Sequence, residues 1–134
     1  MGSNGTTQLR IDKDQYLLGL WEFNERIHEY GACTSVQLNH AGASAYPERL
    51  GGVTSVSASD MPSKTGNAKS RPLEVDEIYQ IVAKYGEVAN RAIRAGFDCV
   101  EVHAGYSYLI LIHQFLSPVY NKRTDKCRWW NGRP

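Results

Sequence analysis

The sequence lacks the features that mark several large classes of protein. No apolar run is long enough to serve as a signal peptide or to span a bilayer. Fifteen basic and 14 acidic residues give a net charge of +1 with no block of one sign, which argues against nucleic-acid and membrane-surface partners. The three cysteines, Cys33, Cys99 and Cys127, are odd in number and widely spaced. They therefore argue against a disulfide framework and favour a reducing, cytoplasmic location.

The chain has enough residues and apolar content for one soluble domain. Its 134 residues can bury a real core, and 42% hydrophobic with 22% charged residues is an ordinary composition. The spacing of apolar residues predicts a first helix over residues 12–30. Asp12 or Asp14 could cap its start and Gly31 could end it. The residues on its expected inner face are Leu17, Leu20, Trp21, Asn24, Ile27 and His28.

A second helix is predicted from Pro72 to Gly96. Glu74, Asp76 and Glu77 fall in its first turn, where carboxylates favour the helix dipole. Its apolar stripe is the clearest helical pattern in the sequence and consists of Ile78, Ile81, Val82, Tyr85, Val88, Ala89, Ala92 and Ile93.

Short strands are predicted after each helix, over residues 33–38 and 99–103, and residues 43–72 are expected to be irregular. The order helix, strand, long loop, helix, strand is a βα repeat, which calls for an α/β fold with a parallel sheet. A (β/α)8 TIM barrel needs about 250 residues. We therefore expect residues 1–134 to form a single incomplete domain with about two βα units of such a barrel.

The exit of the second strand carries a group of polar side chains. His103 ends the strand, and Tyr106 and Tyr108 follow three and five residues later. An imidazole and two phenols leaving one strand end can converge on one polar atom of a ligand, at the edge of α/β sheets where ligands bind. The alternative is a buried strand with a polar exit and solvated tyrosines.

Three short motifs, in order, carry a family resemblance. Residues 36–42 read VQLNHAG, residues 95–103 read AGFDCVEVH, and residues 114–125 combine QFLSP with NKRTD. Over residues 8–126 the chain resembles the Old Yellow Enzyme family of FMN-dependent ene reductases and NADH:flavin oxidoreductases, including 2,4-dienoyl-CoA reductases. The resemblance implies a TIM barrel that holds FMN at its carboxyl-terminal mouth and takes electrons from NAD(P)H.

The resemblance also implies roles for individual residues. Gln37 matches the glutamine that hydrogen-bonds the flavin pyrimidine edge, and His40 lies near the flavin, where a structural role is an equal alternative. His103 matches the donor to the oxygen of an unsaturated carbonyl substrate, with Tyr106 beside it. Tyr108 matches the tyrosine that protonates the α-carbon. Iron–sulfur cysteines, which some relatives possess, would lie outside this segment.

The chain departs from the family pattern at several places. Tyr106 stands where relatives have histidine or asparagine, Ser107 replaces a common glycine, and Ala43 replaces a frequent arginine. Residues 109–113 make the segment after the second strand about two residues longer than in relatives, which would rotate the downstream face of a helix by about 200°. Residues 127–134 abandon the pattern, and the pair Trp129 and Trp130 suggests a frameshifted reading of a Gly-Gly segment.

Three hypotheses therefore stand. The first is a segment of an FMN-dependent enzyme that reduces activated C=C bonds. The second is a catalytically inactive, truncated half-barrel, the product of a frameshift or pseudogene, whose open sheet edges allow self-association. The third is a metal-binding module of His40, Cys99, His103 and His113, whose spacing matches no compact metal motif, so we expect no metal site.

Overall fold

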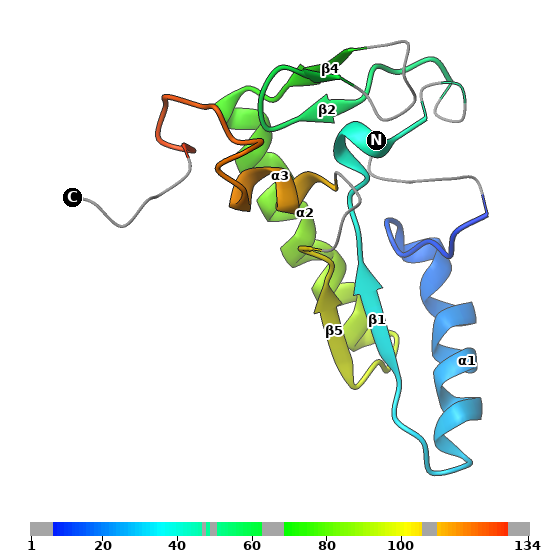
Figure 1. Cartoon of the computed structure of the whole chain (residues 1–134). Helices are drawn as coiled ribbons and strands as arrows, with labels where there is room; N and C mark the ends of the chain where they lie inside the picture. Colours follow the sequence, from blue (N-terminus) through cyan, green and yellow to red (C-terminus); the bar gives the residue numbers. More distant parts are fainter. Residues whose placement is uncertain (1–6, 47, 49–50, 63–68, 106–109, 129–134) are drawn as a thin grey trace. The chain divides into compact units, whose positions relative to one another are not determined.

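The computed structural model describes residues 7–46, 48, 51–62, 69–105 and 110–128 (Figure 1). The chain divides into two compact units, which are considered separately. We call Leu9–Leu38 with Ile78–Val102 the βα unit. The other unit, called the loop unit, contains Met1–Gln8, Asn39–Glu77 and His103–Pro134.

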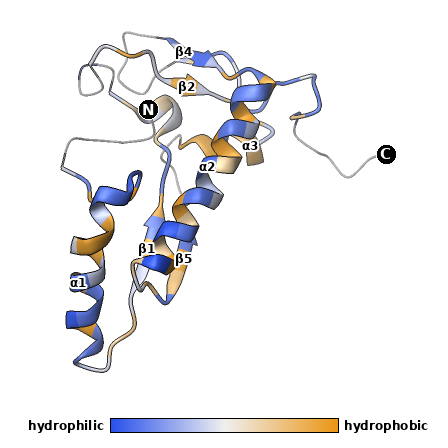
Figure 2. Ribbon diagram, turned by 180° about the vertical axis from the view of Figure 1, so that it is seen from behind, coloured by the Kyte–Doolittle hydropathy of each residue, from blue (hydrophilic) through white to orange (hydrophobic). Residues whose placement is uncertain are grey.

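The βα unit confirms the predicted order of helices and strands. A 3-10 turn, η1 (Asp14–Tyr16), leads into α1 (Leu17–His28), and β1 (Ser35–Leu38) follows. Most of α2 (Val75–Arg94) belongs to this unit and leads to β5 (Cys99–Val102). β1 and β5 pair in parallel. The helix α2 covers one face of this sheet, since the strands lie in front of it in Figure 1 and behind it in Figure 2.

The predicted glycine ends of both helices are confirmed, whereas the predicted aspartate cap of the first helix is not. Gly31 and Gly96 have φ of 76° and 82°, the left-handed conformation expected just beyond a helix. The predicted aspartate cap of the first helix is wrong, because α1 follows Tyr16 and no side chain caps it. The Asp14 carboxylate instead accepts a hydrogen bond from Arg91 Nε at 2.6 Å.

The apolar stripe of α2 is only partly covered. Ala92 is fully buried, and Ile78, Ile81, Tyr85, Val88 and Ala89 are half-buried. Val82 and Ile93 remain 62% and 71% exposed. These two residues are eleven positions apart, so they share one side of the helix, next to the covered face.

The helix α1 is fastened to the turn that ends α2 by a polar side chain. Asn24 is completely buried, and its Nδ2 donates to the Ala95 carbonyl at 2.6 Å. Gly96 lies against the same surface, because a Cβ added there would meet Asn24 Cβ at 3.6 Å and Trp21 Cδ1 at 3.8 Å. The predicted inner face of α1 is therefore confirmed except at Trp21, which is 45% exposed, and its most buried member is an asparagine.

The loop unit is more regular than the sequence predicted for residues 43–72. Its elements are the 3-10 turn η2 (Gly42–Ser44), the strands β2 (Val56–Ser57), β3 (Met61–Pro62) and β4 (Lys69–Pro72), and the helix α3 (Leu111–Leu116). The strands form a sheet in the order β2-β4-β3, parallel between β2 and β4 and antiparallel between β4 and β3. The prediction of an irregular loop is wrong here because strands of two to four residues leave no alternation to detect.

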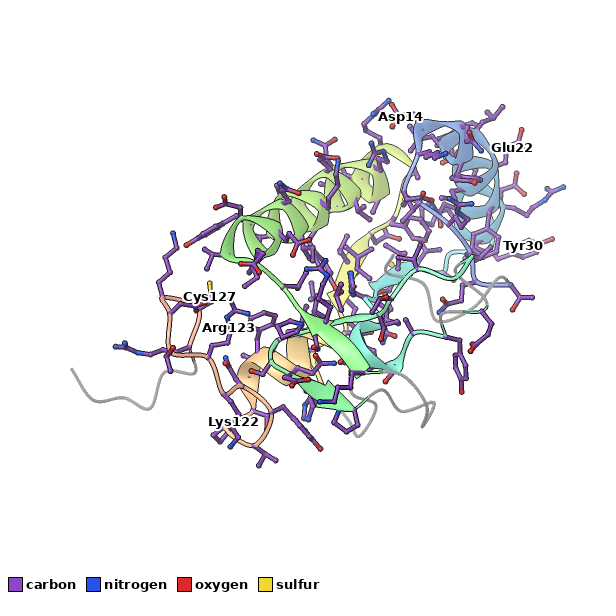
Figure 3. The ribbon with its side chains drawn as sticks, turned by 90° about the horizontal axis from the view of Figure 1, so that it is seen from above. Asp14, Glu22, Tyr30, Lys122, Arg123 and Cys127 are labelled. Atoms are coloured by element: carbon purple, nitrogen blue, oxygen red, sulfur yellow. The ribbon has the colours of Figure 1, made fainter. Side chains whose placement is uncertain are left out.

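A buried arginine holds the carboxyl-terminal loop against this small sheet (Figure 3). The Arg123 side chain is only 9% exposed, and its Nη1 donates to the carbonyls of Ala58 at 2.9 Å and Leu73 at 2.7 Å. Asp125 balances its charge, and the backbone N–H of Lys122 donates to Ser59 Oγ at 2.8 Å. We call these contacts the Arg123 clamp, and they give the NKRTD motif a structural role.

Candidate functional site

The two faces of the β1–β5 sheet differ in polarity. Val36, Leu38 and Val100 lie on one face and are half-buried or buried, although Val102 on the same face is 49% exposed. The alternate residues are all exposed, namely Ser35, Gln37, Cys99 and Glu101. Gln37 lies directly opposite Glu101 in the register, and its Nε2 donates to Glu101 Oε1 at 2.7 Å. One face is therefore suited to packing against a helix and the other to a polar ligand.

The carboxyl ends of both strands lie at the same edge of this sheet. Leu38 and Val102 are opposite each other and are the last residues of β1 and β5. The second strand was predicted to end at His103, whereas β5 ends at Val102. His103 therefore lies one residue beyond the strand, and it is half-buried. In the part of the chain that the structure describes, its imidazole makes no hydrogen bond. It is therefore available to an external acceptor.

His40 is held in its neutral form inside the loop unit. Burial lowers the pKa of His40 from 6.5 to about 4. Its Nδ1 accepts a hydrogen bond from the Gly42 N–H at 3.1 Å, so the ring proton resides on Nε2. The His40 carbonyl accepts from the Leu111 N–H at 3.0 Å. These contacts give His40 a structural role, whereas its predicted position near a flavin stays a prediction.

Gly42 and Gln114 complete this turn, and the sequence analysis assigned a role to neither. Gly42 has φ of 56°, and a Cβ there would lie 2.7 Å from both Leu111 N and Gln114 Nε2. Gln114 is fully buried, and its Oε1 accepts from the Ala58 N–H at 3.1 Å. The sequence signal for this contact was the glycine itself, since a glycine between alanines often marks a close backbone approach.

The predicted tyrosines, Tyr106 and Tyr108, lie outside the described residues, as does Ser107. The helix α3 begins at Leu111, so the inserted segment does lead into a short helix. Ala43, which stands at the position that is often arginine in relatives, is completely buried.

A second polar cluster lies at the opposite, amino-terminal edge of the β1–β5 sheet. Asp98 Oδ2 accepts from the Thr34 N–H at 2.7 Å and lies 2.8 Å from His28 Nε2. The Thr34 N–H, followed by His28, lowers the pKa of the Asp98 carboxyl. Because α1 ends at His28, this cluster fastens the helix to the start of β5. In TIM barrels the amino-terminal face serves stability rather than catalysis.

The proposed metal ligands are not brought together. Within residues 7–46, 48, 51–62, 69–105 and 110–128, no group of three His, Cys, Asp or Glu side chains could hold a metal ion. His113 instead packs against Tyr120, with the ring centroids 5.6 Å apart. None of the described helices is long and apolar enough to cross a membrane.

The Gln37 amide fits the pyrimidine edge of a flavin, which presents both hydrogen-bond donors and acceptors. One Nε2 hydrogen is used by Glu101, and the second can still be donated. Gln37 Oε1 accepts no hydrogen bond from the described part of the chain. The exposed amide can therefore donate and accept at the same time.

Comparison with known proteins identifies relatives over nearly the whole chain. The model of the NADH:flavin oxidoreductase / NADH oxidase family matches residues 2–132. The chain is 39% identical to an NADH oxidase from Thermoanaerobacter brockii, over 93% of this chain and 19% of that protein. It is 40% identical to an NADH:acrylate oxidoreductase from Vibrio harveyi, over 92% of this chain and 12% of the relative.

Solved structures show the same fold. Morphinone reductase in complex with tetrahydroNAD superposes with a TM-score of 0.84 and 31% identity, over 92% of this chain and 38% of the enzyme. An Old Yellow Enzyme homologue from Zymomonas mobilis gives a TM-score of 0.82 and 26% identity, over 94% of this chain and 37% of that protein. The chain thus has the fold of part of a TIM barrel and spans well under half the length of these relatives. It belongs to the NADH:flavin oxidoreductase / NADH oxidase family, the flavin-dependent oxidoreductases that include the Old Yellow Enzymes.

Proposed function

We propose that this chain supplies two βα units of an FMN-dependent oxidoreductase that reduces activated C=C bonds of enones or enoates. The observation that carries the proposal is the polar edge of the β1–β5 sheet. There an exposed glutamine amide lies on one strand, and the parallel neighbour runs directly into a histidine. A relative named NADH:acrylate oxidoreductase also supports an α,β-unsaturated substrate.

The proposed roles follow from the chemistry of each side chain. Gln37 holds the flavin ring through its amide, and His103 donates a hydrogen bond to the substrate carbonyl oxygen. When bound, reduced FMN supplies the hydride, with electrons from NAD(P)H. His103 then stabilises the negative charge that develops on the carbonyl oxygen, with Tyr106 as a second donor. Tyr108 gives a proton to the α-carbon.

A second candidate is a catalytically inactive half-barrel. For the 134 residues taken alone, it is favoured by the small number of barrel strands, because in the described ranges the β1–β5 sheet contains two strands. A barrel of this type closes with eight. Flavin absorbance in the purified chain, together with NAD(P)H-dependent reduction of 2-cyclohexenone, supports the first candidate. A colourless, inactive chain supports the second.

Two variants test the separate roles of the strand-exit residues. Gln37→Leu is expected to weaken binding of FMN, followed by quenching of flavin fluorescence. His103→Ala is expected to leave FMN bound and to weaken binding of 2-cyclohexenone to the flavin-loaded chain. His113→Ala is the matched control, since its ring packs on Tyr120 and no ligand contact is proposed for it. The assignment is wrong if His103→Ala releases FMN while the affinity for the enone is unchanged.

A further inference from the structure

The proposed flavin contact Gln37 makes a hydrogen bond whose role has not been explained. Its Nε2 donates to Glu101 Oε1 at 2.7 Å. The two residues are register partners on parallel strands, so their side chains leave the same face of the sheet next to each other. Both are exposed. In the described part of the chain, Glu101 accepts a side-chain hydrogen bond from Gln37 alone.

A carboxylate next to an amide decides which way the amide points. An ionised glutamate can only accept hydrogen bonds, whereas a primary amide has a donating and an accepting end. If the Gln37 amide turned over, its Oε1 would face the Glu101 oxygens without a proton between them. Glu101 therefore selects the orientation in which Nε2 faces the carboxylate and Oε1 faces away from it.

We propose that Glu101 is a positioning residue that fixes the Gln37 amide in the orientation the flavin pyrimidine edge requires. The inference rests on the proposed function, since it takes Gln37 as the flavin contact. With Nε2 anchored by Glu101, the accepting Oε1 and the second Nε2 hydrogen are presented together to the ligand. Without the carboxylate, the amide turns freely, and the flavin must select the productive orientation on binding.

The competing explanation is an exposed cross-strand pair that only stabilises the sheet. Glu101→Gln separates the two, because glutamine has the same shape but offers either a donor or an acceptor to Gln37. Glu22→Gln on α1 is the matched control, since it removes one exposed carboxylate from the same unit (Figure 3). Thermal unfolding of both variants, followed by circular dichroism, establishes that each remains folded.

Two measurements on the full 134-residue chain test the proposal. The first is the pair of Gln37 side-chain amide proton signals in the flavin-free, 15N-labelled protein, assigned by their loss in Gln37→Glu. The two protons of a glutamine amide give separate signals, and a hydrogen bond to a carboxylate moves the bonded proton further downfield. The Gln37 signals are expected to return to the separation of a free glutamine in Glu101→Gln and to keep the wild-type separation in Glu22→Gln. The second is the FMN dissociation constant, expected to rise by about two- to tenfold in Glu101→Gln, the cost of ordering one side chain that the wild type already holds in place.

The possible failures are distinguishable. Unchanged Gln37 amide signals in Glu101→Gln overturn the proposal. An unchanged FMN dissociation constant also overturns it if the amide signals have moved to those of a free glutamine. A wild-type chain that binds no FMN overturns the proposed function and with it this role for Glu101. Equal FMN binding by the wild type and Glu101→Gln overturns the positioning role alone.

Discussion

Among the described glycines of the loop unit, Gly42 has the least room for a side chain. Gly42→Ala places a methyl group 2.7 Å from the Leu111 nitrogen, at a φ of 56°. Gly51 has a similar φ of 69°, but a Cβ there meets nothing within 4 Å. The left-handed backbone alone costs about 1–2 kcal/mol for a residue with a Cβ.

We therefore predict that Gly42→Ala lowers the free energy of unfolding by at least about 3 kcal/mol, and Gly51→Ala by no more than about 2 kcal/mol. Urea unfolding of the two variants measures both values. Equal losses would show that the close approach to Leu111 is absent.

The buried His40 makes the free energy of unfolding depend on pH between about 4 and 6.5. Because burial reduces its pKa from 6.5 to about 4, the unfolded chain binds more protons than the folded chain between these values. Stability is fully present above pH 6.5 and falls as the pH is lowered toward 4, by at most roughly 3 kcal/mol.

The predicted result is a smaller pH dependence in His40→Gln than in the wild type over this window. Urea unfolding at several pH values measures it. The carboxylates with lowered pKa, such as Glu77 at about 2, lose their stabilisation only below pH 4.5, so they leave the range from pH 4.5 to 6.5 to His40. A His40→Gln variant with the same pH dependence as the wild type would contradict the assignment.

At the scale of elements, the buried Asn24 joins α1 to the end of α2. Asn24→Ala leaves the Ala95 carbonyl without its donor in a buried contact, a loss of about 1–3 kcal/mol. Glu22→Ala, on the same helix but exposed, is expected to change the free energy of unfolding by less than about 0.5 kcal/mol. Chemical unfolding followed by circular dichroism compares the two variants. A negligible effect of Asn24→Ala would mean that α1 is not fastened through this residue.

The elements that could be predicted from the sequence are those that neighbouring residues specify. Helical periodicity located α1 and α2, and left-handed glycines ended both, because these signals lie within a few neighbouring residues. The small β2-β4-β3 sheet escaped prediction, since its strands are too short to show alternation. The Arg123 clamp also escaped it, because its acceptors are carbonyls of Ala58 and Leu73, far away in the chain.

The candidate site was likewise predicted only where its signals lie within short stretches of sequence. Gln37 and His103 follow from the motifs at two strand exits, and the parallel pairing of those strands is confirmed. The contact between Gln37 and Glu101 could not be predicted, because it depends on the register between strands separated by sixty residues. The position of His40 within a close turn depended on Gly42 and Leu111 in the same way.

At the scale of the whole molecule, we propose that the 134-residue chain associates with itself in isolation. In the described ranges β1 and β5 pair only with each other, so each strand has an outer edge that can accept another strand. We predict a sedimentation coefficient that rises with protein concentration. A single monomeric species from micromolar to submillimolar concentration would contradict this.

The central claim is that a flavin binds at the carboxyl edge of the β1–β5 sheet. Its most direct test is a map of amide shifts in the 15N-labelled chain as FMN is added. We expect the largest changes at Gln37, Leu38 and Val102, with Thr34 and Cys99 at the opposite edge unchanged. Changes centred on Thr34 and Cys99, or no saturable change at any residue, would contradict it.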